Sequence, residues 1–215
     1  MILNLFTPSK RKKAAYLKRN CIFGGTFDPI HIGHLNVAYE AMYQKSLSKI
    51  IFLPAAIPPH KLTNNITQSE HRINMIDLNM KDEPNFILNT YEIDRGGINY
   101  TYLTIDYFVN EEKDADWYFL MGGDSLLEFK SWKNIGSILK NIKLLVYPRA
   151  EEEISSLCEL RLEFLKNYGG DIEILEVPRL DISSTLIRKL ISEGKRTPLI
   201  TKETYDYIKD NKLYI

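Results

Sequence analysis

The sequence predicts an α/β fold, a doubly wound and mostly parallel sheet with helices on both faces. Strand-like apolar runs alternate with segments of helical periodicity along almost the whole chain. Several runs, such as residues 117–121 and 143–147, are nearly continuous in apolar residues, which is typical of parallel strands covered on both faces. This alternation indicates a Rossmann-like domain, in which ligands bind beyond the carboxyl ends of the strands.

The expected elements follow one another in regular order. Strands are expected at residues 20–24, 49–53, 86–93, 117–121, 143–147 and 172–177. Helices are expected between them, at residues 34–45, 68–80, 101–112, 134–140 and 151–167, with a further helix that begins near Ser183 and ends at Gly194. Thr67-Gln68-Ser69-Glu70 has the spacing of a capping box, so it predicts a well-marked helix start.

Length and composition are those of one globular domain. The chain has 215 residues, and its 28 basic side chains balance 28 acidic ones. This balance indicates neither a nucleic-acid partner nor a membrane partner, and no apolar run approaches the ~18 residues of a membrane span. Cys21 and Cys158 lie in or beside apolar runs, so we expect reduced core thiols in a cytoplasmic protein.

Residues 1–19 differ from the rest of the chain. They carry two basic groups, at residues 10–13 and 18–19, around a short apolar patch. We interpret them as a solvated basic N-terminal extension, and a tail that contacts phosphates or nucleic acid is the alternative. No internal repeat or linker follows, so residues 20–215 are expected to form a single domain.

Residues 24–34 are the most informative stretch of the chain. Their sequence, Gly-Gly-Thr-Phe-Asp-Pro-Ile-His-Ile-Gly-His, follows an apolar strand and precedes a segment with helical spacing. Backbone N–H groups in such a loop, together with the helix N-terminus, favour a bound anion. The loop lacks the lysine of a Walker motif and the glycine spacing of a dinucleotide fold. No cysteine or carboxylate cluster nearby in the sequence completes a zinc site.

A second group of polar residues lies near the C-terminus. Ser183, Ser184 and Thr185 stand at the expected start of a helix, and Arg188 follows Thr185 by three residues. One serine can cap the helix while another hydroxyl and Arg188 face outward. Taken alone, this pattern is compatible both with simple capping and with anion binding.

The first of these motifs resembles the H-x-G-H signature of the nucleotidyltransferase superfamily. Its longer form, G-G-T-F-D-P-x-H-x-G-H, resembles that of the nicotinate-nucleotide adenylyltransferases, and residues 182–188 resemble the I-S-S-T-x-I-R motif of the same family. Shorter matches, such as residues 58–61 and 123–125, extend the resemblance over residues 20–215. The chain departs from the family pattern outside the two motifs, at Asn99, Leu103 and Thr201.

The resemblance implies transfer of an adenylyl group from ATP to nicotinate mononucleotide, giving deamido-NAD and pyrophosphate. It implies catalytic roles for His31, His34 and Arg188. It further implies that ATP and its phosphates are bound by Gly24, Gly25, Thr26, Phe27, Asp124, Ser183, Ser184 and Thr185, and that the mononucleotide is contacted by His60, Lys61 and Trp132. Mg²⁺ is expected to arrive with ATP, held mostly by phosphate oxygens and water, with no metal ligand from the protein.

Two alternatives stay open at this stage. Pantetheine-phosphate adenylyltransferases share H-x-G-H and the Ser-Ser-Thr helix, but they are usually shorter and differ around residues 24–26 and 59–61. A non-catalytic nucleotide-binding module is the second alternative, although both histidines and Arg188 are present. His60 and Lys61 could instead belong to an ordinary surface loop, and Trp132 could be a packing residue. Whether the protein forms a homo-oligomer is also open.

Overall fold

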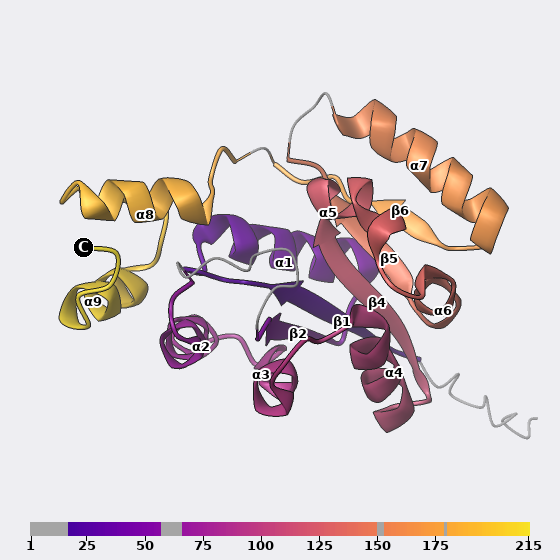
Figure 1. Ribbon diagram of the computed structural model, residues 1–215, viewed down its shortest axis with the longest axis horizontal. Helices are drawn as coiled ribbons and strands as arrows, with labels where there is room; N and C mark the ends of the chain where they lie inside the picture. The colour runs from indigo at the N-terminus through magenta and orange to yellow at the C-terminus, as the bar shows by residue number, and fades with distance from the viewer. Residues whose placement is uncertain (1–16, 57–65, 150–152, 179) are drawn as a thin grey trace, which may run out of the picture.

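The structure is a computed structural model that describes residues 17–56, 66–149, 153–178 and 180–215. Within them, one six-stranded sheet has the order β3-β2-β1-β4-β5-β6 (Figure 1), and every neighbouring pair is parallel. The strands are β1 (Lys18–Gly25), β2 (Lys49–Pro54), β3 (Phe86–Leu88), β4 (Ala115–Gly122), β5 (Lys143–Tyr147) and β6 (Ile172–Ile174). The chain order reverses between β1 and β4, which is where ligands of doubly wound sheets bind.

Helices cover both faces of the sheet, as the sequence predicts, and each face has its own core. Successive residues of β1 point to opposite faces, so Cys21 and Phe23 join one core while Ile22 joins the other. The first core includes residues of α1 (Ile32–Lys45), α2 (Ser69–Asp77), α8 (Ser184–Ser192) and α9 (Lys202–Asp210). The second includes residues of α4 (Thr101–Glu111), α5 (Gly123–Leu127), α6 (Ile135–Asn141) and α7 (Glu153–Tyr168).

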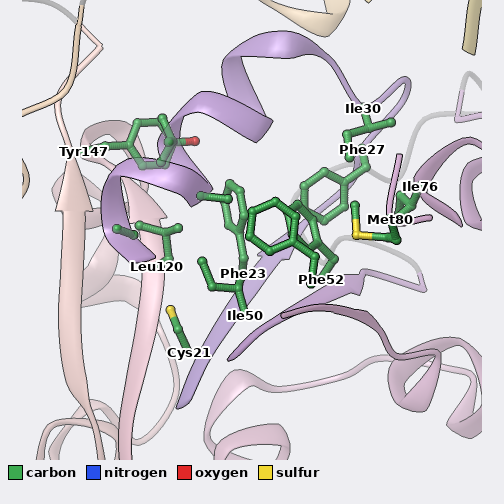
Figure 2. Packing of buried hydrophobic residues seen from close by; sticks show 14 of the residues in the cluster. Cys21, Phe23, Phe27, Ile30, Ile50, Phe52, Ile76, Met80, Leu120 and Tyr147 are labelled. Carbon is green, nitrogen blue, oxygen red and sulfur yellow. The ribbon is translucent and has the colours of Figure 1, made fainter. Parts of the chain in front are cut away.

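The loop after β1 is anchored in the first core by an aromatic side chain. Phe27 lies with its ring centroid 5.4 Å from that of Phe23 in β1 and 5.8 Å from that of Phe52 in β2 (Figure 2). Its backbone has φ +50°, and its side chain is 2% exposed. Burial of this ring therefore holds the loop in a conformation that a non-glycine residue rarely adopts.

Three sequence expectations about local structure are wrong. The strand expected over residues 86–93 ends at Leu88, and a short helix, α3 (Tyr91–Arg95), follows, with the Asn89 side chain accepting a hydrogen bond from the Tyr91 N–H. The capping box at Thr67 does not form, because the Thr67 N–H donates instead to the Asp28 carboxylate and Gln68 takes the N-cap position without a side-chain bond. Cys158 is exposed on α7, whereas Cys21 is a core thiol.

The described chain begins close to β1 and ends after α9. β1 begins at Lys18, so the last residues of the expected extension belong to the sheet, and residues 1–16 lie outside the described residues. Figure 1 shows the C-terminus beside α8 and α9, at the end of the molecule away from α7. In the described part of the chain, no helix has both the length and the apolar composition that crossing a membrane requires.

Candidate active site

The site is built around residues 26–31, which connect β1 to α1 and are called the motif loop below. β1 ends at Gly25 and α1 begins at Ile32, so the loop lies at the carboxyl end of the sheet, beside the switch point. A Cβ atom on Gly25 would lie 2.9 Å from the ring of Phe27. The glycine therefore allows the loop to turn back closely over its own buried aromatic side chain.

The two histidines of the motif cap α1 reciprocally. His31 occupies the N-cap position, and its Nδ1 accepts a hydrogen bond from the His34 N–H at 3.3 Å. The Nδ1 atom of His34 accepts in turn from the His31 N–H, also at 3.3 Å. This is a capping box made of two imidazoles, with histidine where glutamate or glutamine commonly stands.

The capping box fixes the tautomer of both rings. Because each Nδ1 accepts a backbone hydrogen bond, the proton of each neutral imidazole resides on Nε2. The rings of His31 and His34 are stacked, with centroids 3.6 Å apart and planes 20° apart. Two Nε2–H donors therefore stand next to each other at the helix N-terminus, where the helix dipole favours negative charge.

Both imidazoles are held in the neutral form. Burial, together with the positive charge of Arg149, lowers the pKa of His31 to about 4. Burial also lowers the pKa of His34 well below its usual value, with His31 and Arg149 as further causes. Near neutral pH the histidines thus act as neutral hydrogen-bond donors in the unliganded protein.

Gly33 is the position that makes the histidine pair sterically possible. A Cβ atom there would lie 3.0 Å from Nδ1 of His31 and 3.6 Å from Cβ of Ile182. A Cβ at this position would press against the imidazole of His31, whereas its distance to Ile182 is that of an ordinary van der Waals contact. The glycine between the histidines therefore leaves room for the His31 ring.

The second motif is docked directly on the first. Ser183 is the N-cap of α8 and accepts from the Leu186 N–H, whereas the Ser184 hydroxyl donates to the carbonyl oxygen of Pro29 at 3.0 Å. Arg188 Nη1 donates to the carbonyl oxygen of Asp28 at 2.6 Å, and its Nη2 lies 3.4 Å from the Thr185 hydroxyl. The structure thus brings His31, His34 and Arg188 to one end of the sheet, although 160 residues separate Asp28 from Arg188.

The ends of β4 and β5 contribute an ion pair that sequence reasoning identified only in part. Asp124 follows β4, and its Oδ2 lies 3.3 Å from Nη1 of Arg149, which follows β5. Because the charge of Arg149 acts on both histidines, this guanidinium belongs to the same site. Arg149 was missed because it lies outside both motifs. The available signal was its place just after a parallel strand, where α/β sites collect.

Known proteins are similar to this chain over nearly its whole length. A family model described as cytidylyltransferase-like matches residues 22–190. A probable nicotinate-nucleotide adenylyltransferase of Clostridium acetobutylicum is 40% identical over 200 residues, covering 93% of this chain and 100% of that relative. One of Clostridium tetani is 40% identical over 199 residues, covering 92% and 100%. The chain belongs to the nicotinate-nucleotide adenylyltransferases of the cytidylyltransferase-like family.

Solved structures agree with the fold. The structure described as Plasmodium falciparum nicotinic acid mononucleotide adenylyltransferase complexed with NaAD has a TM-score of 0.76 and 21% sequence identity, and the match covers 92% of this chain and 97% of that chain. The same enzyme complexed with APC has a TM-score of 0.73 at 20% identity, with the same coverage. These likenesses establish the Rossmann-like architecture.

The structure places the other residues that the sequence connected with the site less fully. Trp132 packs at the edge of the second core, with its ring centroid 5.2 Å from that of Phe129 and 6.3 Å from that of Phe119. His60 and Lys61 lie outside the described residues. Gly24 is paired within the sheet, opposite Leu53 of β2. The carbonyl oxygen of Thr26 accepts a hydrogen bond from Arg72 Nη1 at 2.9 Å.

Proposed function

We propose that the protein transfers the adenylyl group of ATP to nicotinate mononucleotide, releasing pyrophosphate and deamido-NAD. The observation that carries the proposal is the complete eleven-residue motif, folded as a pair of neutral imidazoles at the switch point of the sheet. Relatives named probable nicotinate-nucleotide adenylyltransferases, 40% identical over their full length, support the proposal.

The reaction needs charge stabilisation more than proton transfer. A phosphate oxygen of the mononucleotide attacks the α-phosphorus of ATP, and the bond to the bridging oxygen of the β-phosphate breaks, so that pyrophosphate departs. The attacking phosphomonoester is largely ionised near neutral pH, so no enzyme base is required. The enzyme must bring two polyanions together in line and stabilise the charge that develops on the transferred and departing groups.

The site offers three kinds of positive potential for this task. In our proposal the Nε2–H groups of His31 and His34 donate to oxygens of the reacting phosphates, assisted by the N-terminus of α1. The backbone amides of Gly25, at the end of β1, and of Thr26 add further donors. Arg188, with Ser184 and Thr185 beside it, holds the β- and γ-phosphates after exchanging part of its bond to the loop for a phosphate oxygen.

Arg149 is added to this group on structural grounds. Its charge already acts on both histidines, so it is near enough to act on an anion bound to them. Asp124 orients the guanidinium through their ion pair, and we propose that the carboxylate contacts the ribose of ATP as well. Trp132, His60 and Lys61 stay predictions for the acceptor side of the site.

The metal is proposed to be carried by ATP itself. Across the described residues, no group of three or more His, Cys, Asp or Glu side chains is placed to hold an ion. Of the carboxylates described at the site, that of Asp124 is engaged by Arg149, and that of Asp28 accepts hydrogen bonds from Tyr214 and from the Thr67 N–H. Mg²⁺ would therefore be held mainly by phosphate oxygens and water, and it would supply charge neutralisation of the polyphosphate.

Pyrophosphate release tests the proposed function directly. ATP and Mg²⁺ are supplied with nicotinate mononucleotide, nicotinamide mononucleotide or phosphopantetheine in parallel. We expect nicotinate mononucleotide to give the highest kcat/KM. A higher value with phosphopantetheine would overturn the acceptor, and no turnover with any of the three would favour a binding module instead of an enzyme.

A further inference from the structure

The last residues of the chain return to the motif loop. The hydroxyl of Tyr214, the penultimate residue, donates a hydrogen bond to Oδ1 of Asp28 at 2.6 Å. Asp28 is 4% exposed and lies three residues before His31. The tail that carries Tyr214 is itself anchored. The Leu213 N–H donates a hydrogen bond to the carbonyl oxygen of Ile208 in α9 at 3.0 Å, and the side chains of Leu213 and Tyr214 pack against the first core.

The contact is a charge-assisted hydrogen bond at a buried position. Burial raises the pKa of the Tyr214 phenol, and the negative charge of Asp28 raises it further, so the phenol stays a donor. The other carboxylate oxygen of Asp28, Oδ2, accepts from the Thr67 N–H at 3.2 Å. Hydrogen bonds of this class are shorter and roughly twice as strong as neutral ones.

Asp28 is also the residue through which the two motifs meet. Its carboxylate is held by the tail and by residue 67, while its backbone carbonyl accepts from Arg188. The next carbonyl, that of Pro29, accepts from Ser184. A shift of Asp28 would therefore displace the histidines and Arg188 together. Arg188 is hydrogen-bonded to the Asp28 carbonyl, and the histidines follow the Asp28-Pro29 dipeptide in the same loop.

We propose that Tyr214 is a positioning residue for adenylyl transfer, holding Asp28 and thereby the histidine pair at the geometry that the reaction requires. The proposal rests on the proposed function for its kinetic consequence. Tyr214 acts through Asp28 and touches neither substrate. Its effect belongs to the transition state more than to ground-state binding, because a small misplacement of oriented groups reduces the rate far more than the affinity.

The experiment compares Tyr214→Phe with Tyr207→Phe as a matched control. Tyr214→Phe removes the hydroxyl and leaves the packed ring. Tyr207 also belongs to the C-terminal region and loses its own contacts in the control, with Nδ1 of His71 and Nδ2 of Asn74, both at 2.9 Å and both in α2. For each protein, kcat, the two KM values, the melting temperature and hydrogen exchange of residues 24–34 are measured.

We expect kcat of Tyr214→Phe to fall about tenfold with both KM values changed less than about twofold, and we expect faster exchange in residues 24–34. Tyr207→Phe should keep the wild-type kcat and loop exchange while melting at a lower temperature. Wild-type kcat and exchange in Tyr214→Phe would overturn the inference, as would equal losses of kcat in the two variants. If wild-type protein turned over none of the acceptors, the proposed function would fail, and the exchange comparison would still decide the role of Tyr214.

Discussion

His34 has two separable roles in this structure, and a set of three variants can distinguish them. Its Nδ1 caps α1 through the His31 N–H, whereas its Nε2–H is the donor proposed for the reacting phosphate. His34→Ala removes both atoms at once, so a loss of activity in that variant alone would not identify the cause. Asparagine keeps an acceptor close to the Nδ1 position and lacks the outer donor, while glutamine keeps a donor near Nε2.

The expected magnitudes follow from these contacts. Loss of one donor aimed at developing charge reduces kcat roughly 10²–10³-fold, so we expect this fall in His34→Asn and His34→Ala. His34→Gln should retain a larger part of kcat. Loss of the cap contact costs about 1 kcal/mol, which corresponds to a melting temperature lower by about 2–4 °C in a chain of this size.

The melting temperature, kcat and affinity for ATP, measured on one preparation of each protein, separate the capping role of His34 from its catalytic role. We expect His34→Ala to melt below His34→Asn by about the cap contribution of 2–4 °C, with equally low kcat in the two variants. Affinity for ATP should change little, since the donor acts on charge that grows in the transition state. A folded His34→Asn protein with near-native kcat would refute the mechanism and leave His34 as a capping residue.

Three further predictions concern the charged groups around the histidines. Arg188→Ala should weaken the use of ATP more than acceptor binding, by roughly 1.5–3 kcal/mol in kcat/KM for ATP; unchanged kinetics would show that Arg188 only holds the loop. Arg149→Gln should raise the KM for ATP and raise the pKa of His31, which NMR titration of the imidazole measures; an unshifted pKa would contradict the proximity inferred here. Because burial holds the pKa of His31 at about 4 against 6.5 for an ordinary histidine, the unfolded chain binds the proton first as the pH falls. The contribution of His31 to the free energy of unfolding should therefore be full above pH 6.5 and fall by up to about 3 kcal/mol between pH 6.5 and pH 4. Because burial lowers the pKa of His34 as well, melting curves of His31→Asn should show a smaller decline than those of the wild type, and an equal decline would contradict the role of His31.

The sequence by itself determined the architecture and the main motifs. The strand at residues 143–147 was predicted to the residue, because a short apolar run between Lys143 and Pro148 is typical of a strand in a parallel sheet. Residues 24–34 were predicted from their residue types and spacing to form a loop and a helix start, which the structure confirms, and anion binding by this loop stays a prediction. Both predictions depend on patterns within a short stretch of residues, which can be read without knowing the tertiary structure.

Local signals failed where another polar side chain competed for the same backbone groups. Thr67 had the spacing of a cap, but its N–H donates to Asp28, which lies 39 residues earlier. The run at residues 86–93 continued the strand pattern, yet the polar side chain of Asn89 ended the strand and started a helix. In each case a hydrogen bond to a nearby polar group replaced the expected one, which residue periodicity does not express.

Tertiary structure alone decided how the site is assembled. The sequence assigned Arg188 to phosphate, whereas the fold also places its guanidinium on the carbonyl oxygen of Asp28. The sequence indicated two histidines at a helix start. Their mutual capping and their burial, which only the fold shows, make them neutral Nε2–H donors. Arg149 and Tyr214 enter the site from separate parts of the chain. Charges and hydrogen bonds act through space, so the state of each group depends on neighbours that the order of residues does not reveal.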